Sequence, residues 1–173
     1  MKSILYLNYY KNIIKHKKYY MVGFDLDWTI IKPKYGKIFP KNKDDWQLWD
    51  ENVLTKLNEL SLDSKYIIVI LSNQKQIINR KLYNEFIEKI NNIHKLLNLD
   101  FIFMASLQDN IYRKPNVGMI DYLIKKTNIL INFNKSYYIG DMAGRKKDKY
   151  DTDLKFAKNL NVKFFTPEQF FLK

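Results

Sequence analysis

The stretch Met21-Val-Gly-Phe-Asp-Leu-Asp27 sets the pattern for the whole chain, because an apolar run ends there in two carboxylates separated by one residue. Residues 21–26 are typical of a buried β-strand. Two like charges at the end of such a strand are unfavourable unless a cation or hydrogen bonds compensate them. The motif is compatible with a Mg²⁺ site, and equally with a solvated turn in which an aspartate caps the next segment.

Similar short apolar runs recur along the chain and alternate with helical patterns. The predicted strands are residues 21–26, 66–71, 101–105, 136–139 and 163–165. Apolar residues at helical spacing predict helices near residues 53–60, 82–97, 119–127 and 152–160. Thr166-Pro-Glu-Gln169 combines an N-cap, a proline at the first helical position and a capping-box glutamine. This alternation predicts an α/β fold with a mostly parallel central sheet and helices on both faces.

The chain has 173 residues, of which 46% are hydrophobic, and contains no repeat or linker-like stretch. We therefore expect a single domain over residues 1–173. Residues 1–19 differ in composition, since they contain five lysines, several tyrosines and no acidic residue. This basic aromatic N-terminal segment is compatible with an edge strand, a flap or a poorly ordered arm.

The net charge of +12 favours a polyanionic partner, and a nucleic-acid backbone is the commonest one that a soluble protein meets. An AT-rich genome, such as that of a large DNA virus, would also enrich the chain in Lys, Asn and Ile. Part of the charge is then a consequence of codon usage.

Several classes of site and location are excluded by what the sequence lacks. It has no cysteine and only two histidines, so thiolate zinc sites, disulfides and histidine-rich metal centres are excluded. The longest apolar run, residues 66–71, is too short to cross a bilayer. Residues 3–14 are too polar for a signal peptide. We expect a soluble intracellular protein of the nucleus or cytoplasm, including that of a virus-infected cell, with no membrane partner.

Polar residues follow each of the first four predicted strands. In parallel α/β sheets, ligands bind outside the carboxyl ends of the strands. The second strand is followed by Ser72 and Asn73, the third by Lys114 and the fourth by Asp141. Each of these motifs alone also fits an ordinary surface turn.

The order Asp-x-Asp, Ser, Lys, Asp resembles the four motifs of the haloacid-dehalogenase-like (HAD) phosphohydrolases. Further stretches are similar to the phosphatase domain of polynucleotide kinase 3'-phosphatases. They are Gly23-Phe-Asp-Leu-Asp27, Gly36-Lys-Ile-Phe-Pro40, Asp45-Trp46, Ser72-Asn-Gln74, Tyr112-Arg-Lys-Pro115, Gly118-Met119, Gly140-Asp-Met-Ala-Gly-Arg145, Lys146-Lys-Asp148, Asp153 and Thr166-Pro-Glu-Gln-Phe-Phe-Leu-Lys173. The resemblance covers about residues 20–173 and implies a Rossmann-like HAD fold with a minimal cap.

The resemblance also implies a role for each motif. Asp25 would be the nucleophile and Asp27 the general acid and base, with Mg²⁺ held by Asp25, the Asp27 carbonyl and Asp141. Ser72, Asn73 and Lys114 would hold the phosphoryl oxygens, with Lys114 also counted as catalytic. Asp148 and Asp153 would act indirectly, by holding the metal ligands and the lysine in position. Residues implied to contact DNA phosphates are Arg80, Lys81, Arg113 and Arg145.

These roles imply a Mg²⁺-dependent DNA 3'-phosphatase that works through an aspartyl-phosphate in strand-break repair, acting as a monomer on DNA ends. The chain lacks the Gly-x-x-x-x-Gly-Lys-Ser/Thr loop of a 5'-kinase, so no nucleotide cofactor is expected. Trp28 departs from the family pattern, which usually has Gly there, and could alter the pocket, stack on a base or impair activity. The alternatives are a HAD phosphatase of small metabolites and an inactive nucleic-acid-binding module.

Overall fold

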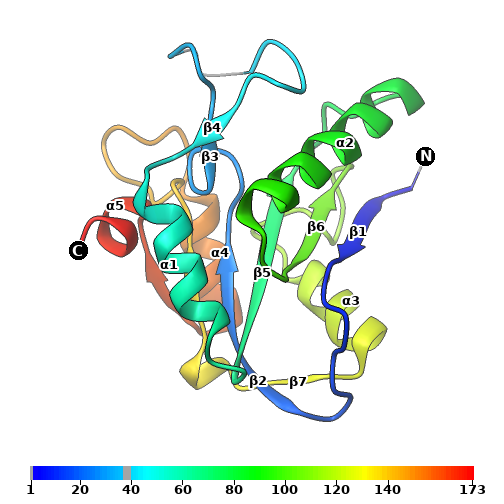
Figure 1. Ribbon diagram of the computed structural model, residues 1–173, viewed down its shortest axis with the longest axis vertical. Helices are drawn as coiled ribbons and strands as arrows, with labels where there is room; N and C mark the ends of the chain where they lie inside the picture. Colours follow the sequence, from blue (N-terminus) through cyan, green and yellow to red (C-terminus); the bar gives the residue numbers. More distant parts are fainter. Residues whose placement is uncertain (1, 37–39) are drawn as a thin grey trace.

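The computed structural model describes residues 2–36 and 40–173, and a mostly parallel sheet runs through its centre (Figure 1). The strand order is β1-β6-β5-β2-β8-β9, and β7 pairs with the beginning of β2. The strands are β1 (Ile4–Asn8), β2 (Lys18–Phe24), β5 (Tyr66–Asn73), β6 (Ile102–Ser106), β7 (Leu130–Ile131), β8 (Tyr137–Ile139) and β9 (Lys163–Phe165). All pairings in this sheet are parallel except that of β1 with β6.

The central strands are buried on both faces, which explains why their sequences are continuous apolar runs rather than alternating ones. In β5, Ile68 and Ile70 point into one hydrophobic cluster, whereas Ile67 and Val69 point into the other. Strand β2 pairs in parallel with β5, with Gly23 beside Val69, so its side chains also alternate between the two clusters. The sheet therefore separates two cores.

Helices cover both of these cores. The helices are α1 (Asn52–Ser61), α2 (Arg80–Leu97), α3 (Gly118–Thr127), α4 (Thr152–Leu160) and α5 (Pro167–Phe171), with a short 3₁₀ helix, η1, at Phe133–Lys135. Buried residues of α1, α2 and α5 belong to the first core, and those of α3 and α4 to the second. The predicted α/β fold with helices on both faces is confirmed.

Two parts of the chain lie outside the repeating strand–helix pattern. The N-terminal segment contributes β1, which pairs antiparallel with β6 from Ile4 opposite Ser106 to Asn8 opposite Ile102. Between β2 and α1, the two-residue strands β3 (Ile31–Lys32) and β4 (Gln47–Leu48) form a small separate sheet. In Figure 1 this small sheet lies above the end of the central sheet towards which β2 and β5 point.

The predicted elements differ from the observed ones mainly at their ends. Strand β2 stops at Phe24, so the first aspartate of the motif lies just outside it. Strand β5 extends to Asn73 and α2 begins at Arg80, two residues earlier than predicted, because the Asn79 side chain accepts a hydrogen bond from the Leu82 amide. The capping box at Thr166 and Gln169 is present as predicted.

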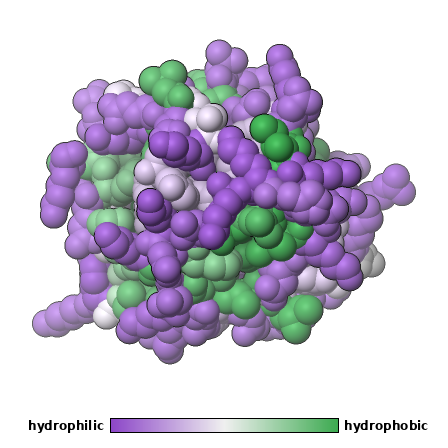
Figure 2. Space-filling view, turned by 90° about the horizontal axis from the view of Figure 1, so that it is seen from below, coloured by the Kyte–Doolittle hydropathy of each residue, from purple (hydrophilic) through white to green (hydrophobic). Residues whose placement is uncertain are grey.

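The face at the beginning of the parallel strands is mostly hydrophilic. Figure 2 views the molecule from below and shows hydrophilic side chains with apolar residues between them. Among the described residues, no helix is both long and apolar enough to span a membrane.

Candidate active site

The two aspartates that follow β2 have different surroundings. Asp25 is buried, and its amide donates to the Ile139 carbonyl of the neighbouring β8 at 2.8 Å. The side chain of Asp27 is 42% exposed. Directly after Asp27 the chain makes a turn, in which the Trp28 amide donates a hydrogen bond to the Ile31 carbonyl. One carboxylate is therefore enclosed while the other faces the opening.

Trp28 has a positive φ of 62°, a backbone conformation that favours glycine. A non-glycine residue in this region has an unfavourable energy of about 1 kcal/mol or more. The departure from the family pattern noted in the sequence thus falls at a position where glycine is the unstrained choice. Trp28 is half-buried, so burial of its ring offsets part of this strain.

A buried cation lies beside Asp25, in what we call the lysine cluster: Lys114, Asp25, Asp153 and Tyr138. The Lys114 Nζ donates to Asp25 Oδ1 at 2.6 Å and to Asp153 Oδ1 at 2.8 Å. It also donates to the Tyr138 hydroxyl at 2.7 Å. All three donor positions of the ammonium group therefore have partners.

The backbone of Lys114 is held by the last residue of β5. The Asn73 amide nitrogen donates to the Lys114 carbonyl, and the Lys114 amide donates to Asn73 Oδ1, both at 3.0 Å. This paired contact links the loop before α3 to the sheet and aims Lys114 at Asp25. Asn73 was predicted to hold a phosphoryl oxygen, and in the structure its carboxamide faces the loop backbone.

Burial and charge together shift the pKa values in the lysine cluster. Burial raises the pKa of Asp25 well above its usual range, although Lys114 acts in the opposite direction. Burial alone would lower the pKa of Lys114, but the attraction of Asp153 and Asp25 outweighs it and raises this pKa. Lys114 is consequently protonated and positively charged at neutral pH.

A third carboxylate completes an acidic group near the lysine. Asp141 follows β8 and Gly140, and its pKa is raised to about 7 by burial and by repulsion from Asp153. Oxygen atoms of Asp25, Asp141 and Asp153 lie within 4.8 Å of one another. A Cβ on Gly140 would come within 2.5 Å of Asp153, so only glycine allows β8 and α4 to approach this closely.

This acidic group fits a divalent cation. Carboxylate oxygens are the ligands that Mg²⁺ prefers, and three of them converge here. Asp153, however, already binds Lys114 through Oδ1 and the Met142 amide through Oδ2. Asp25 and Asp141 are therefore the two carboxylates better suited to coordinate an ion, with Asp153 behind them.

Asp27 is held by Gln74, the residue that follows β5, and lies near a lysine of α2. The Gln74 amide nitrogen donates to Asp27 Oδ2 at 2.7 Å and to the buried Ser72 hydroxyl at 2.9 Å. On the other side, the Nζ of buried Lys89 lies 3.7 Å from Asp27 Oδ1. Ser72 and Asp27 are thus brought together through Gln74.

A second ionic group connects the loop after β8 with α5, and we call it the arginine cluster: Arg145, Asp148 and Lys147 of the loop and Glu168 of α5. The Arg145 guanidinium donates to Asp148 and Glu168 at 2.8 and 2.9 Å, and to the Asp141 carbonyl at 2.8 Å. Asp148 also accepts from the Ala143 and Arg145 amides. Burial raises the pKa of Asp148, but its hydrogen bonds with Arg145 and these amides lower it overall.

The remaining residues predicted to contact DNA are two exposed residues, Arg80 and Lys81, and the half-buried Arg113. Arg80 and Lys81 are exposed at the start of α2, and the only ion pair of Lys81 with a described residue joins it to Glu85 at 4.0 Å. Arg113 precedes Lys114 and pairs with Asp109 at 3.1 Å. Its Nη1 is buried and has no hydrogen-bond partner among the described residues. Arg145 is instead engaged with the protein, as described above.

Three residues near the site were not among the predicted site residues: Gln74, Lys89 and Tyr138. Lys89 carried a usable signal, because it lies between Phe86 and Ile93 on the apolar face of α2, where an unpaired charge is unfavourable. Tyr138 carried none, since a tyrosine in a buried strand is ordinary. Of the motif Gly36-Lys-Ile-Phe-Pro40, residues 37–39 lie outside the described residues.

The fold is that of the HAD-like phosphatases. A protein of Mesorhizobium loti described as a HAD-like phosphatase superposes with a TM-score of 0.65 at 15% identity, covering 92% of this chain and 77% of the other. At that identity the likeness shows the fold alone.

The family is shown by sequence. The chain belongs to the polynucleotide kinase 3 phosphatase family, whose model matches residues 20–171. It is 41% identical to the bifunctional polynucleotide phosphatase/kinase of Schizosaccharomyces pombe, covering 97% of this chain and 41% of that protein. It is 35% identical to the polynucleotide 3'-phosphatase of Saccharomyces cerevisiae, covering 86% of each. The chain thus spans less than half the length of the first relative and most of the second.

Proposed function

We propose that this protein is a Mg²⁺-dependent polynucleotide 3'-phosphatase that removes 3'-phosphate from DNA ends during strand-break repair. The observation that carries the proposal is the lysine cluster, in which a buried cation contacts Asp25 at 2.6 Å at the edge of the sheet. Family membership and the names of the two relatives support the same reaction.

In the first proposed step, Asp25 acts as the nucleophile. Its carboxylate attacks phosphorus and forms an aspartyl-phosphate, while the bond between phosphorus and the 3' oxygen breaks. Asp27 donates a proton to that oxygen, which leaves as the 3'-hydroxyl. The half-exposed position of Asp27, held by Gln74 and near Lys89, suits a group that must meet both the leaving group and solvent.

In the second step, water cleaves the aspartyl-phosphate. Asp27, now ionised, removes a proton from the water that attacks phosphorus, and inorganic phosphate and the Asp25 carboxylate are released. Lys114 offsets negative charge at the phosphoryl group throughout, because its three hydrogen bonds hold it beside Asp25. Ser72, whose hydroxyl accepts a hydrogen bond from Gln74, would donate to a phosphoryl oxygen.

Mg²⁺ would be held by the carboxylates of Asp25 and Asp141 together with the Asp27 backbone carbonyl. When bound, the ion would supply positive charge that lets Asp25 approach an anionic phosphate. Asp153 accepts hydrogen bonds from Lys114 and from the Met142 amide, next to Asp141. These contacts would keep the Asp141 carboxylate in place.

The substrate is proposed to be a DNA end, because the net charge of +12 favours a long polyanion over a small metabolite. Arg80 and Lys81, at the start of α2, and Arg113, beside Lys114, would supply cations for the DNA phosphates. Arg145 would act differently, by fixing the loop that carries Asp141 through its hydrogen bond to the Asp141 carbonyl.

The test is a phosphate-release assay with the wild-type protein and an Asp25→Asn variant. We expect release from a 3'-phosphorylated oligonucleotide that needs Mg²⁺, and a loss of about four orders of magnitude or more in the variant because the nucleophile is gone. Circular dichroism checks that the variant is folded. Substantial activity of folded Asp25→Asn would exclude Asp25 as the nucleophile. Faster release from sugar phosphates than from the oligonucleotide would favour a metabolite phosphatase instead.

A further inference from the structure

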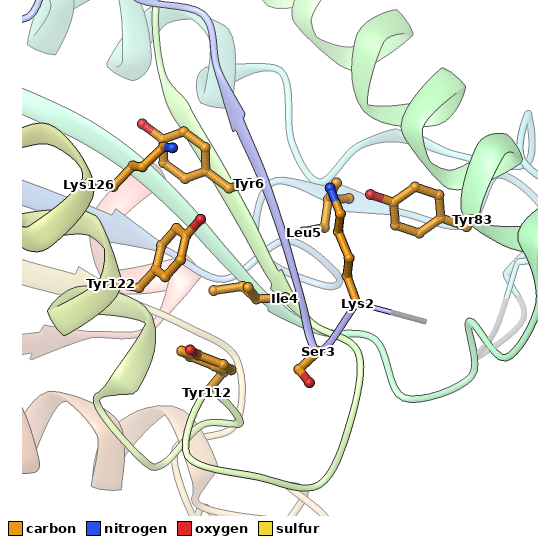
Figure 3. A pocket seen from close by; sticks show the side chains of 9 residues that line it. All are labelled: Lys2, Ser3, Ile4, Leu5, Tyr6, Tyr83, Tyr112, Tyr122 and Lys126. Carbon is orange, nitrogen blue, oxygen red and sulfur yellow. The ribbon is translucent and has the colours of Figure 1, made fainter.

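A groove runs along the N-terminal strand, away from the lysine cluster, and we call it the tyrosine groove. It has a volume of about 500 Å³. Figure 3 shows its side chains on both sides of β1, with Tyr83 of α2 on one side and Tyr112, Tyr122 and Lys126 on the other. Strand β1 and the residues before it contribute Lys2, Ser3, Ile4, Leu5 and Tyr6.

The chemistry of the tyrosine groove is aromatic and basic. Four of its nine lining residues are tyrosines, two are lysines and none is acidic. The Tyr122 ring lies 5.8 Å from the Tyr6 ring and 6.1 Å from the Tyr112 ring, so three of the rings form one group. No hydrogen bond joins the hydroxyls of these three tyrosines to another described residue. Half-buried rings beside lysines are the combination that binds unpaired bases and their phosphates.

One end of the tyrosine groove, at the start of β1, lies at the edge of the sheet that carries the candidate active site. In the strand register, Ile4 is opposite Ser106, and Ser106 is opposite Asn73, the residue that holds the Lys114 backbone. Three inter-strand spacings separate β1 from β2, which corresponds to roughly 14 Å. At about 3.4 Å per stacked nucleotide, that distance corresponds to about four nucleotides.

We propose that the tyrosine groove binds the unpaired nucleotides that precede the 3'-phosphate, with bases stacked on Tyr112 and Tyr122 and phosphates near Lys126. The inference rests on the proposed function, because the 3' end of the same strand must lie at Asp25. It adds a substrate preference: a strand that reaches across β5 and β6 to β1 is bound better than a very short one.

The experiment compares kcat/KM for a 3'-phosphorylated dinucleotide and a 3'-phosphorylated single-stranded dodecanucleotide. The wild-type protein is expected to prefer the longer substrate. In Tyr122→Ala the ratio of the two values falls by about 5- to 140-fold, the loss expected for about one stacked base. Tyr122→Phe, which keeps the ring, retains the wild-type ratio. Lys126→Gln lowers the ratio and reduces its dependence on salt, whereas Lys163→Gln, at the opposite edge of the sheet, changes neither.

The outcomes separate this inference from the proposed function. Release from both lengths at equal kcat/KM, or an unchanged ratio in Tyr122→Ala, would overturn the groove proposal and leave the phosphatase proposal intact. If the wild-type protein releases phosphate from neither, the proposed function fails. In that case the groove proposal is still tested by measuring the affinity for a labelled dodecanucleotide by fluorescence anisotropy. Equal affinities of the wild-type protein and Tyr122→Ala would overturn it. Equal affinity is also the result expected if β1 binds a peptide or a second copy of this chain instead of DNA, and it would overturn the groove proposal in that case too.

Discussion

The lysine cluster and the arginine cluster use similar contacts in opposite environments. In both, a cation contacts acidic side chains at 2.6–2.9 Å. The Lys114 side chain is only 2% exposed, whereas that of Arg145 is 30% exposed. In the buried cluster the charges depend on one another, because water cannot compensate a missing partner. In the arginine cluster the Asp148 side chain is only 6% exposed, but water reaches Arg145, Glu168 and Lys147, so the contacts of these three contribute less to stability.

The largest effect is expected from Lys114→Met, which keeps most of the apolar stem and removes the charge. Asp25 and Asp153 would then be left close together without a cation, and the free energy of unfolding is expected to fall by about 3–5 kcal/mol. Urea denaturation without divalent cations measures this change. A loss below about 1 kcal/mol would show that the buried cluster does not depend on Lys114, and that the comparison fails.

A smaller effect is expected from Arg145→Lys, which keeps the charge but loses the planar group that reaches Asp148, Glu168 and the Asp141 carbonyl together. We expect the free energy of unfolding to fall by about 1–2 kcal/mol. The same denaturation measurement, run beside Lys147→Gln as a control at the more exposed cation, would isolate the contribution of the guanidinium. A loss as large as that of Lys114→Met would contradict the distinction between the clusters.

The smallest effect concerns acid stability. Partial burial raises the pKa of Glu168, but hydrogen bonds, the largest from Lys147, lower it from 4.5 to about 2. The folded state therefore favours the ionised form. The resulting stability is present above pH 4.5 and is lost as the pH falls towards 2. Because the side chain is 38% exposed, we expect only about 1 kcal/mol after solvent screening.

Glu168→Gln tests this expectation. The advantage of the wild-type protein over the variant should be full at about pH 6 and shrink as the pH is lowered to about 3, as measured by urea denaturation at each pH. An advantage that is independent of pH would mean that the Glu168 carboxylate does not carry the effect.

Much of the fold could be predicted because its central strands are buried on both faces. Continuous apolar runs such as residues 66–71 can fit few places other than the middle of a parallel sheet. The two-residue strands β3, β4 and β7 could not be predicted, since so few residues show no periodicity. The ends of β2 and α2 shifted because hydrogen bonds at the turns, such as the Asn79 cap, decide them locally.

The candidate site could be predicted to the level of which strand ends meet, because parallel strands bring their carboxyl ends to one edge. That rule places Asp25, Ser72 and Asp141 together. It does not reveal which side chains form hydrogen bonds with one another. The contacts of Asn73 with the Lys114 backbone and of Gln74 with Asp27 depend on side-chain conformations that the sequence pattern does not specify.

Strand β1 has a practical consequence for anyone who shortens this protein. The family match begins at residue 20, yet β1 lies before it and hydrogen-bonds along the outer side of β6. A fragment starting at residue 20 would leave the buried apolar strand Ile102–Ser106 as an open sheet edge. Such an edge readily pairs with other chains, so that fragment would be prone to aggregate even though every motif of the family is intact.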